Sequence, residues 1–281
     1  MDTTIHDVAK LAGVSKSTVS RALSNSQLIS EKTRQNVLRA AEILNYRPNA
    51  IAQAMITKKT WNIGFIIYQK HKPIISQPFY THILETILDE ANLIGYNVFV
   101  SSDQDIKISS GEILIQKKVD GVILASRVDK NIIMNFRKKN IPVVLINNTI
   151  DHDDISCIVN DDYNGTLEAM DHFISGGHRK IGILCGPLEH VSYSERYKGY
   201  MSALKEHGID PDYHLIQITD STLQHGYNAM KSILAVKKSI PSAVFCTNDM
   251  MAVGAMKAIK QAGYKIPGDI AVTGFDGIEL G

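Results

Sequence analysis

Apolar residues recur at helical spacing in residues 4–12. At about 100° per residue, one arc of this segment is apolar and comprises Ile5, Val8, Ala9, Leu11 and Ala12. Thr4 precedes the arc, and Asp7 follows three residues later, which is the spacing of a capping box. Gly13 then favours a left-handed helix end. The pattern predicts an amphipathic helix of about two turns.

Two further helices are expected directly afterwards. Ser15 is the predicted N-cap of residues 16–23, where Val19, Ala22 and Leu23 share one face. The opposite face carries Lys16, Ser17, Ser20 and Arg21. Ser30 is the predicted N-cap of a third helix, whose expected core-facing residues are Val37, Leu38, Ala41 and Leu44.

Two short helices joined through a glycine turn, the second with a basic and hydroxyl-bearing face, are typical of a helix-turn-helix. In that motif the second helix enters the DNA major groove. The helix pattern alone also fits a three-helix protein-interaction bundle that does not bind nucleic acid.

After Lys59 the pattern changes to apolar runs that alternate with amphipathic segments. The predicted strands span residues 62–68, 97–102, 121–125, 142–147, 156–161, 180–186, 214–219, 242–248 and 269–276. Predicted helices lie between most of them, at residues 79–94, 163–176, 194–207, 225–236 and 249–262. Continuous Val/Ile/Leu strands with crossover helices indicate parallel sheets covered on both faces, an α/β fold. Ligands bind such sheets at the carboxyl ends of the strands.

Charge divides the chain at the same place. Residues 1–60 hold nine Lys and Arg against four Asp and Glu, whereas the remaining residues hold 21 bases and 25 acids. The formal net charge of +1 for all 281 residues conceals this difference. A small basic unit joined to a slightly acidic one suggests a polyanion-binding module attached to a second function.

Several other classes of protein are disfavoured. Cys157, Cys185 and Cys246 each lie in an apolar strand-like run, so we expect small buried thiols rather than disulfides or metal ligands. The histidines show no metal-binding spacing, and we expect neither a metal nor a cofactor. Without GxSxG, Walker or GxGxxG motifs an enzyme is not expected, and Ser194–Arg196 fits a strand-to-helix binding turn. No apolar run approaches the roughly 20 residues of a membrane span, and no signal peptide precedes the first helix, so we expect a cytoplasmic protein.

The segments "TIHDVAKLAGVSKSTVSRALSN" and "ISEKTRQNVLRAAEILNYRPNAIA" resemble the DNA-binding domain of the LacI/GalR family of bacterial transcriptional regulators. The resemblance implies that Lys16, Ser17 and Arg21 read bases and that several hydroxyl groups bind phosphates. The full set of expected DNA-contacting residues is Thr4, Ser15, Lys16, Ser17, Thr18, Ser20, Arg21, Ser30, Thr33, Asn49, Ala52 and Met55.

The resemblance also gives a role to the stretch "RPNAIAQAMITKK", which is too short to be stable as an isolated helix. In the family this is a hinge helix, which orders when two subunits of a homodimer bind operator DNA side by side. Asn49 is then the N-cap, and Met55 is the apolar wedge that enters the minor groove, where relatives usually have leucine. The alternative is that Met55 only packs against the second unit.

The remainder resembles the two-lobed, periplasmic-binding-protein-like (type I) domain of the same family, with "GGHRKIGILCGP", "SERYKGY", "TNDMMAVGAM" and "IAVTGFD" as landmarks. This implies a small effector, often a sugar or nucleoside, that binds between the lobes and controls operator affinity, usually in a repressor. The expected ligand-binding residues are Asn147, Arg196, Asn248 and Asp276. For Arg196 a structural salt bridge is the alternative, and for Asn147 a structural role is equally open.

We therefore predict a helix-turn-helix domain in residues 1–48, a hinge and linker in 49–60, and an effector-binding and dimerisation domain in 61–281. The segment "IIYQKHKPIISQPFY" and Ser221 depart from the family pattern, which leaves the ligand open. Family members continue past "GFDGIELG", so the last domain is expected to be incomplete, with exposed sheet edges and poor folding. The runner-up interpretation is a ligand-binding protein of the periplasmic type with no role on DNA.

Overall fold

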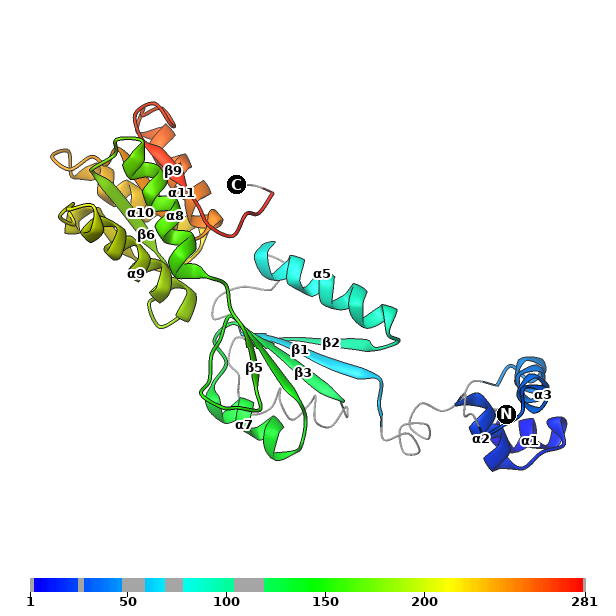
Figure 1. The fold of residues 1–281 in the computed structure, drawn as a ribbon. Coiled ribbons are helices and arrows are strands. Elements are labelled where there is room, and N and C mark those ends of the chain that lie inside the picture. Colours follow the sequence, from blue (N-terminus) through cyan, green and yellow to red (C-terminus); the bar gives the residue numbers. More distant parts are fainter. Residues whose placement is uncertain (1–2, 25–27, 47–58, 69–77, 104–118, 280–281) are drawn as a thin grey trace. The chain divides into compact units, whose positions relative to one another are not determined.

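The computed structural model of the chain (Figure 1) describes residues 3–24, 28–46, 59–68, 78–103 and 119–279. The chain divides into two compact units. We call Met1–Asn62 with Lys118–Asp120 the head, and Ile63–Lys117 with Gly121–Gly281 the body. Within the described residues, no helix has the length and apolar character that crossing a membrane requires.

The described part of the head contains the three predicted helices, α1 (Ile5–Ala12), α2 (Lys16–Leu23) and α3 (Glu31–Ile43). The Asp7 carboxylate accepts the Thr4 backbone N–H at 2.9 Å, and Gly13 ends α1 at a φ of 66°. Ser15 caps α2 by accepting the Thr18 N–H, and Ser30 caps α3 in the same way. The predicted helix starts are confirmed, and α3 ends at Ile43, three residues before its predicted end at Tyr46.

Small residues build the hydrophobic core of the head. Its buried members are Val8, Ala9, Ala12, Val19, Ala22, Val37, Ala40 and Ala41. The prediction that Leu38 faces this core is wrong, because it is 42% exposed; Leu11, in the apolar arc of α1, is also 50% exposed. The helices meet through alanines and valines, which brings their backbones close and leaves no room for these larger side chains.

The first sheet of the body comprises β1 (Asn62–Tyr68), β2 (Asn97–Asp103), β3 (Gly121–Ala125), β4 (Val143–Ile146) and β5 (Ser156–Ile158). The strand order is β2-β1-β3-β4-β5, and β1, β3, β4 and β5 are parallel. Helix α5 (Pro78–Leu93) packs on the face that carries Phe65, Ile67 and Ala125. Figure 1 shows α7 (Lys130–Lys138) on the other side of the sheet.

The second sheet comprises β6 (Ile181–Cys185), β7 (Ile216–Ile218), β8 (Ala243–Cys246) and β9 (Ala271–Thr273), in the order β7-β6-β8-β9. All three neighbouring pairs are parallel. Alternation along the strands divides the surrounding core into two halves: Ile183 and Phe245 face α8 (Asp162–Ser175) and α9 (Val191–Glu206). On the other face, Leu184 and Val244 pack with α10 (Leu223–Ala235) and α11 (Asp249–Gln261).

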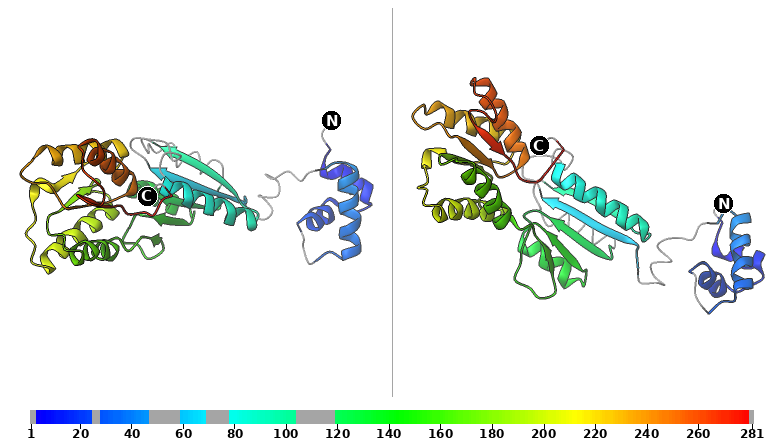
Figure 2. Two further views of the ribbon diagram at one scale, coloured as in Figure 1. Left: turned by 90° about the horizontal axis from the view of Figure 1, so that it is seen from above. Right: turned by 45° about the horizontal axis from the view of Figure 1, so that its top comes forward.

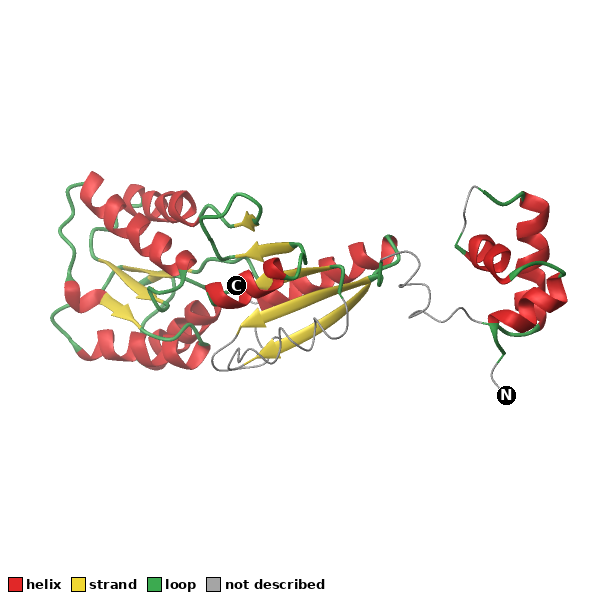
Figure 3. Cartoon of the chain, turned by 90° about the horizontal axis from the view of Figure 1, so that it is seen from below, coloured by secondary structure: helices red, strands yellow, loops and turns green. Residues whose placement is uncertain are grey.

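Helices therefore cover both faces of the second sheet, as the views in Figures 2 and 3 show. This is the layered arrangement that continuous apolar strands with crossover helices predict. The predicted fold class, a small helical domain followed by two lobes with parallel sheets, is confirmed.

Two details of the body differ from the prediction, and one prediction is not tested. Helix α7 was not predicted, although Asp129 caps it and Ile132, Ile133 and Phe136 are buried along it. Strands β5, β7 and β9 are shorter than expected; for β7 the reason is that residues 213–215 form a turn of 3-10 helix instead of strand. The predicted hinge, with Asn49, Ala52 and Met55, lies outside the described residues.

Candidate functional site

The outer face of α2 carries the residues that are predicted to read DNA. Lys16, Ser17 and Arg21 are exposed, whereas Val19 and Ala22 are buried against the other helices of the head. The two classes alternate because a helix with one apolar stripe buries that stripe and leaves its polar side chains in solvent. The folded head thus presents two cations and a hydroxyl on one helix face.

Hydroxyl groups cluster at the amino end of α2. The Ser15 hydroxyl lies 2.8 Å from that of Ser17 and 2.9 Å from that of Thr18. Ser30 and Thr33 form a similar pair, with 2.9 Å between their hydroxyl oxygens, at the start of α3. Thr4 is exposed at the start of α1, and Ser20 is half-buried on α2. These positions suit donors to phosphate oxygens, since helix amino ends also offer free N–H groups.

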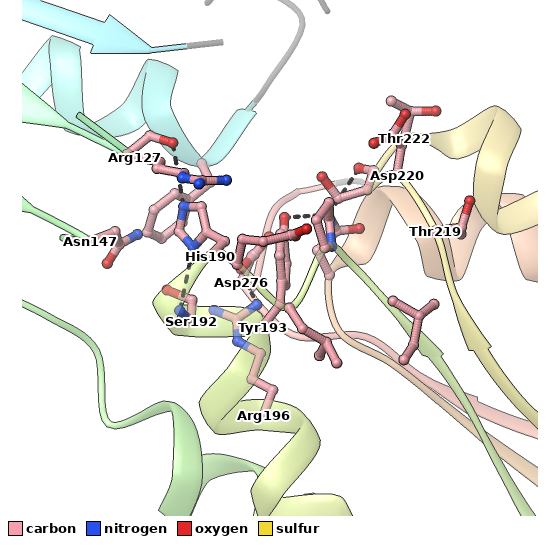
Figure 4. A pocket seen from close by; sticks show the side chains of 18 of the residues that line it. Arg127, Asn147, His190, Ser192, Tyr193, Arg196, Thr219, Asp220, Thr222 and Asp276 are labelled. Carbon is pink, nitrogen blue, oxygen red and sulfur yellow. Dashed lines mark hydrogen bonds and ion pairs between the residues drawn. The ribbon is translucent and has the colours of Figure 1, made fainter. Parts of the chain in front are cut away.

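The body contains a cavity of about 650 Å³ at the carboxyl ends of its strands (Figure 4). Ser126 and Arg127 follow β3, and Asn147 follows β4. From the second sheet, residues 187–193 follow β6, residues 219–222 follow β7, Asn248 follows β8 and Asp276 follows β9. The cavity therefore draws its lining from both sheets, at the edge where parallel sheets bind ligands. All four predicted ligand-binding residues line it.

Arg196 is the central charge of this cavity, although it is only 2% exposed. Its guanidinium donates to Asp162 at 2.8 Å, to Asp276 at 3.1 Å and to the backbone oxygen of Thr247. It also lies 3.7 Å from the centre of the Phe275 ring. Removing one partner of such a buried pair leaves an uncompensated charge. Arg196 thus forms the structural salt bridge that was the alternative interpretation, and it also lines the cavity, as expected of a ligand-binding residue.

Asn248 is held by the hydrogen bonds of its side chain, and Asn147 is buried with a left-handed backbone. The Asn248 side-chain oxygen caps α11 by accepting the Met251 N–H at 2.8 Å, and its nitrogen donates to the Ser221 carbonyl and the Tyr193 hydroxyl. Asn147 is 5% exposed and has a φ of 52°, a left-handed conformation that asparagine tolerates better than most residues. Both residues line the cavity wall.

Burial controls the protonation of the wall. It raises the pKa of the Asp276 carboxyl above its usual range, and the Arg196 cation opposes this shift. It also lowers the pKa of His190 to about 4, helped by the positive charges of Arg196 and Arg127. His190 Nδ1 accepts the Ser192 N–H, so the ring proton is on Nε2, which lies 3.3 Å from the Ser126 hydroxyl. The imidazole is therefore neutral at pH 7.

Several residues that line the cavity were not predicted from the sequence. They are Phe79, Tyr80, Ser126, Arg127, His190, Ser192, Tyr193, Asp220 and Thr222. Most follow a strand end within a few residues, which is the signal that identifies them. The prediction that Ser194–Arg196 forms a strand-to-helix turn is wrong, because these residues lie inside α9, which begins at Val191.

The cysteines offer no reactive group to this site. Cys185 and Cys246 are buried, and burial raises the pKa of the Cys185 thiol to about 12. Cys157 is only partly buried, so the expectation of burial is wrong for this residue. No group of three His, Cys, Asp or Glu side chains in the described parts of the chain is arranged to hold a metal ion.

Two family models match this chain. The family model for bacterial regulatory proteins of the lacI family matches residues 4–49. The model for periplasmic binding proteins and the sugar-binding domain of the LacI family matches residues 60–280. Together the two models span the head and the body.

Individual relatives cover nearly the whole chain. The probable HTH-type transcriptional repressor ExuR of Bacillus subtilis (strain 168) is 38% identical over 98% of this chain and 82% of its own length. The HTH-type transcriptional repressor PurR of Mannheimia succiniciproducens is 32% identical over the same shares. Among solved structures, the lac repressor dimer bound to operator and the anti-inducer ONPF has a TM-score of 0.84 and 29% identity, covering 99% of this chain and 84% of that one. A complex of the transcriptional regulator CelR with cellobiose has a TM-score of 0.72 and 28% identity, with the same coverage. The chain therefore belongs to the LacI family of bacterial regulatory proteins and is a DNA-binding transcriptional regulator with an effector-binding domain, not an enzyme.

Proposed function

We propose that this regulator is a repressor that binds a specific operator through α2. A small effector that binds in the cavity of the body raises or lowers its affinity for the operator. The observation that carries the DNA-binding half is the exposed face of α2, with Lys16, Ser17 and Arg21, above a buried Val19 and Ala22. A helix with such a face enters the major groove, where lysine and arginine bind the guanine O6 and N7 atoms.

The remaining hydroxyl groups of the head have a positioning role in this proposal. Thr4, Ser15, Thr18, Ser20, Ser30 and Thr33 donate to phosphates and set the register of the head on the duplex. Such contacts carry affinity and salt dependence but little sequence information.

A homodimer provides the second contact with DNA. We assign residues 1–48 to the DNA-binding domain, 49–60 to the hinge and 61–281 to the effector-binding domain, and the family matches at 4–49 and 60–280 support these boundaries. The hinge lies outside the described residues, and its roles remain those that the family resemblance implies: Asn49 as N-cap, Ala52 as a DNA-contacting residue and Met55 as the wedge. The related lac repressor was solved as a dimer on its operator, which supports pairing of two chains.

The effector half of the proposal rests on the cavity. Asn147, Arg196, Asn248 and Asp276 supply amide, guanidinium and carboxylate groups, which form paired hydrogen bonds with hydroxyl-rich ligands. A sugar or a related metabolite is the ligand class that fits this chemistry, and CelR in its complex with cellobiose is a precedent. If the ligand changes DNA affinity, operator DNA must change ligand affinity by the same factor.

The Lys16→Ala variant tests base reading. We expect it to lose roughly 1–3 kcal/mol of discrimination at one base pair of the operator, since one side-chain contact to a base edge is removed. Binding to a series of single-base operator variants, measured by fluorescence anisotropy at fixed salt, gives the loss at each position. The control is Lys32→Ala, an exposed lysine on α3 that is outside the predicted base readers. Equal losses at every base pair for Lys16→Ala would rule out a reading role.

A further inference from the structure

One side of the cavity carries an arginine that forms no salt bridge with the described residues. Arg127 is exposed, follows β3 and lines the cavity. Within the described residues, no carboxylate oxygen lies within 4.0 Å of its guanidinium nitrogens. Arg196, by contrast, is already paired with Asp162 and Asp276. Arg127 is therefore the positive charge that remains available to a ligand.

A buried hydroxyl without a partner lies on the same wall. Ser192 is 3% exposed, and its Oγ has no hydrogen-bond partner among the described residues. Leaving a buried hydroxyl unbonded costs free energy, and such groups are rare in native proteins. The Oγ itself has less than 1 Å² of accessible surface, so a ligand oxygen becomes its partner only when the side chain rotates toward the cavity that Ser192 lines.

Ser192 lies in the first turn of α9, a helix of 16 residues, and Arg127 lies close enough to His190, the N-cap of this helix, to affect its pKa. The unsatisfied N–H groups and the helix dipole at such an end favour a negative charge. His190 caps the helix and adds no charge of its own in its neutral form. Figure 4 shows Arg127, His190 and Ser192 on one side of the cavity, with Asp220 and Thr222 on the other.

The acidic groups of the cavity restrict where an anion can bind. Asp220 and Asp276 lie on the wall that the second sheet supplies, where carboxylates accept hydrogen bonds from hydroxyls and repel anions. Glu189 is exposed at the rim beside His190 and does not pair with Arg127. The wall thus has one end suited to a negative group and another suited to sugar hydroxyls.

We propose that the effector is a sugar derivative with one anionic group, a carboxylate or a phosphate, bound by Arg127 and the Ser192 hydroxyl at the amino end of α9. This inference rests on the proposed effector-binding function and specifies the ligand class of the same cavity. The hydroxyls of the ligand then bind Asp276, Asn248 and Asp220.

Matched sets of probes test the proposal on the full chain. The sets are glucose, glucuronate and glucose 6-phosphate, and the three corresponding galactose compounds. Thermal shift gives the ranking, and isothermal titration gives the affinities. In at least one set we expect a charged member to bind about tenfold or more tightly than its neutral parent, because charge-assisted hydrogen bonds are strong. Whether the carboxylate or the phosphate is preferred identifies the anionic group.

Single substitutions test the contacts of Arg127 and Ser192 with the ligand and distinguish them from a change in the overall charge or stability of the protein. Arg127→Gln is expected to remove the preference for the charged member, and Arg127→Lys to keep part of it. Lys139→Gln, which removes an exposed charge at the end of α7 away from the cavity, is the matched control and should leave the preference unchanged. Ser192→Ala should weaken binding of the charged member several-fold without lowering the melting temperature of the free protein, because its Oγ has no partner to lose.

Two results would overturn the inference: neutral parents that bind as well as or better than the charged members in both sets, or an unchanged preference in Arg127→Gln. The first result leaves the proposed function intact, because an effector still binds. If neither charged nor neutral probes bind, the inference fails together with the proposed sugar effector, while the DNA-binding test of Lys16→Ala remains independent.

Discussion

At the scale of single residues, the environment of each side chain sets the chemistry of the cavity wall. His190 stays neutral because it is largely removed from water and lies near the positive charges of Arg196 and Arg127. Asp276 is pushed toward its protonated form by burial and held back by Arg196. His190 therefore presents a neutral ring, with one donor and one acceptor nitrogen, at neutral pH.

His190 also links the stability of the protein to pH. Its pKa falls from 6.5 to about 4 on folding, so the unfolded chain binds a proton between these values and the native chain does not. The stabilisation is complete above about pH 6.5 and is lost as the pH falls toward 4. Replacement by asparagine, which caps helices without titrating, should flatten the decline in the free energy of unfolding over this range.

Urea unfolding at a series of pH values between 7 and 4 measures this decline. The control is His82→Asn, which changes a histidine whose side chain is 86% exposed on α5 and should leave the slope as in the parent chain. Equal slopes for the parent and His190→Asn would show that His190 does not carry a depressed pKa in the folded protein.

At the scale of elements, glycines let the paired helices approach closely. Helices α10 and α11 meet at Gly226 and Gly254, and α8 and α9 meet at Gly199. A Cβ on Gly254 would lie 2.1 Å from the Leu223 carbonyl oxygen and 2.7 Å from the Tyr227 nitrogen. These are backbone atoms, which cannot rotate away. Asn248 caps α11, so the spacing of this pair bears on the cavity.

Gly254→Ala should therefore destabilise the body, by about 1–3 kcal/mol or more, because the helices must separate to admit the methyl group. The matched control is Gly268→Ala, where the nearest atom to an added Cβ is the Lys265 Cβ at 3.7 Å. That substitution should be neutral or slightly stabilising, since alanine restricts the unfolded chain. Chemical denaturation of both variants gives the comparison. A Gly254→Ala variant as stable as Gly268→Ala would contradict the close packing.

The same scale shows what a sequence can predict. Every strand in the described part of the body coincides with an apolar run, and every helix of the head begins at its predicted cap. Helical periodicity did not predict burial correctly where close packing determines which side chains are buried. Leu38 has the spacing of a core residue but is exposed, because small residues such as alanine form the contacts between the helices. The site was predictable where polar residues end strands, as at Asn147 and Asn248. Arg127 and Ser192 could be assigned to the cavity only from the fold, because no sequence motif distinguishes them from other arginines and serines of the chain.

At the scale of the whole molecule, two chemistries are joined in one chain. The head offers exposed cations and hydroxyls on α2, and the body offers a cavity lined by polar groups from both of its sheets. In a regulator these two sites are coupled, and the coupling free energy acts equally in both directions. A ligand that binds the body without differential affinity for two states of the protein cannot control the head.

The most direct test of this account measures DNA affinity and its response to ligand in one experiment. The full chain selects duplexes from a random library, and fluorescence anisotropy then gives Kd for the selected duplex and a scrambled one, with and without a saturating probe sugar. We predict salt-sensitive binding that is on the order of 10³-fold or more tighter for the selected duplex, and a ligand-induced change of about 5-fold to 150-fold. Equal affinity for both duplexes, or an affinity that no cavity-binding ligand alters, would contradict the account.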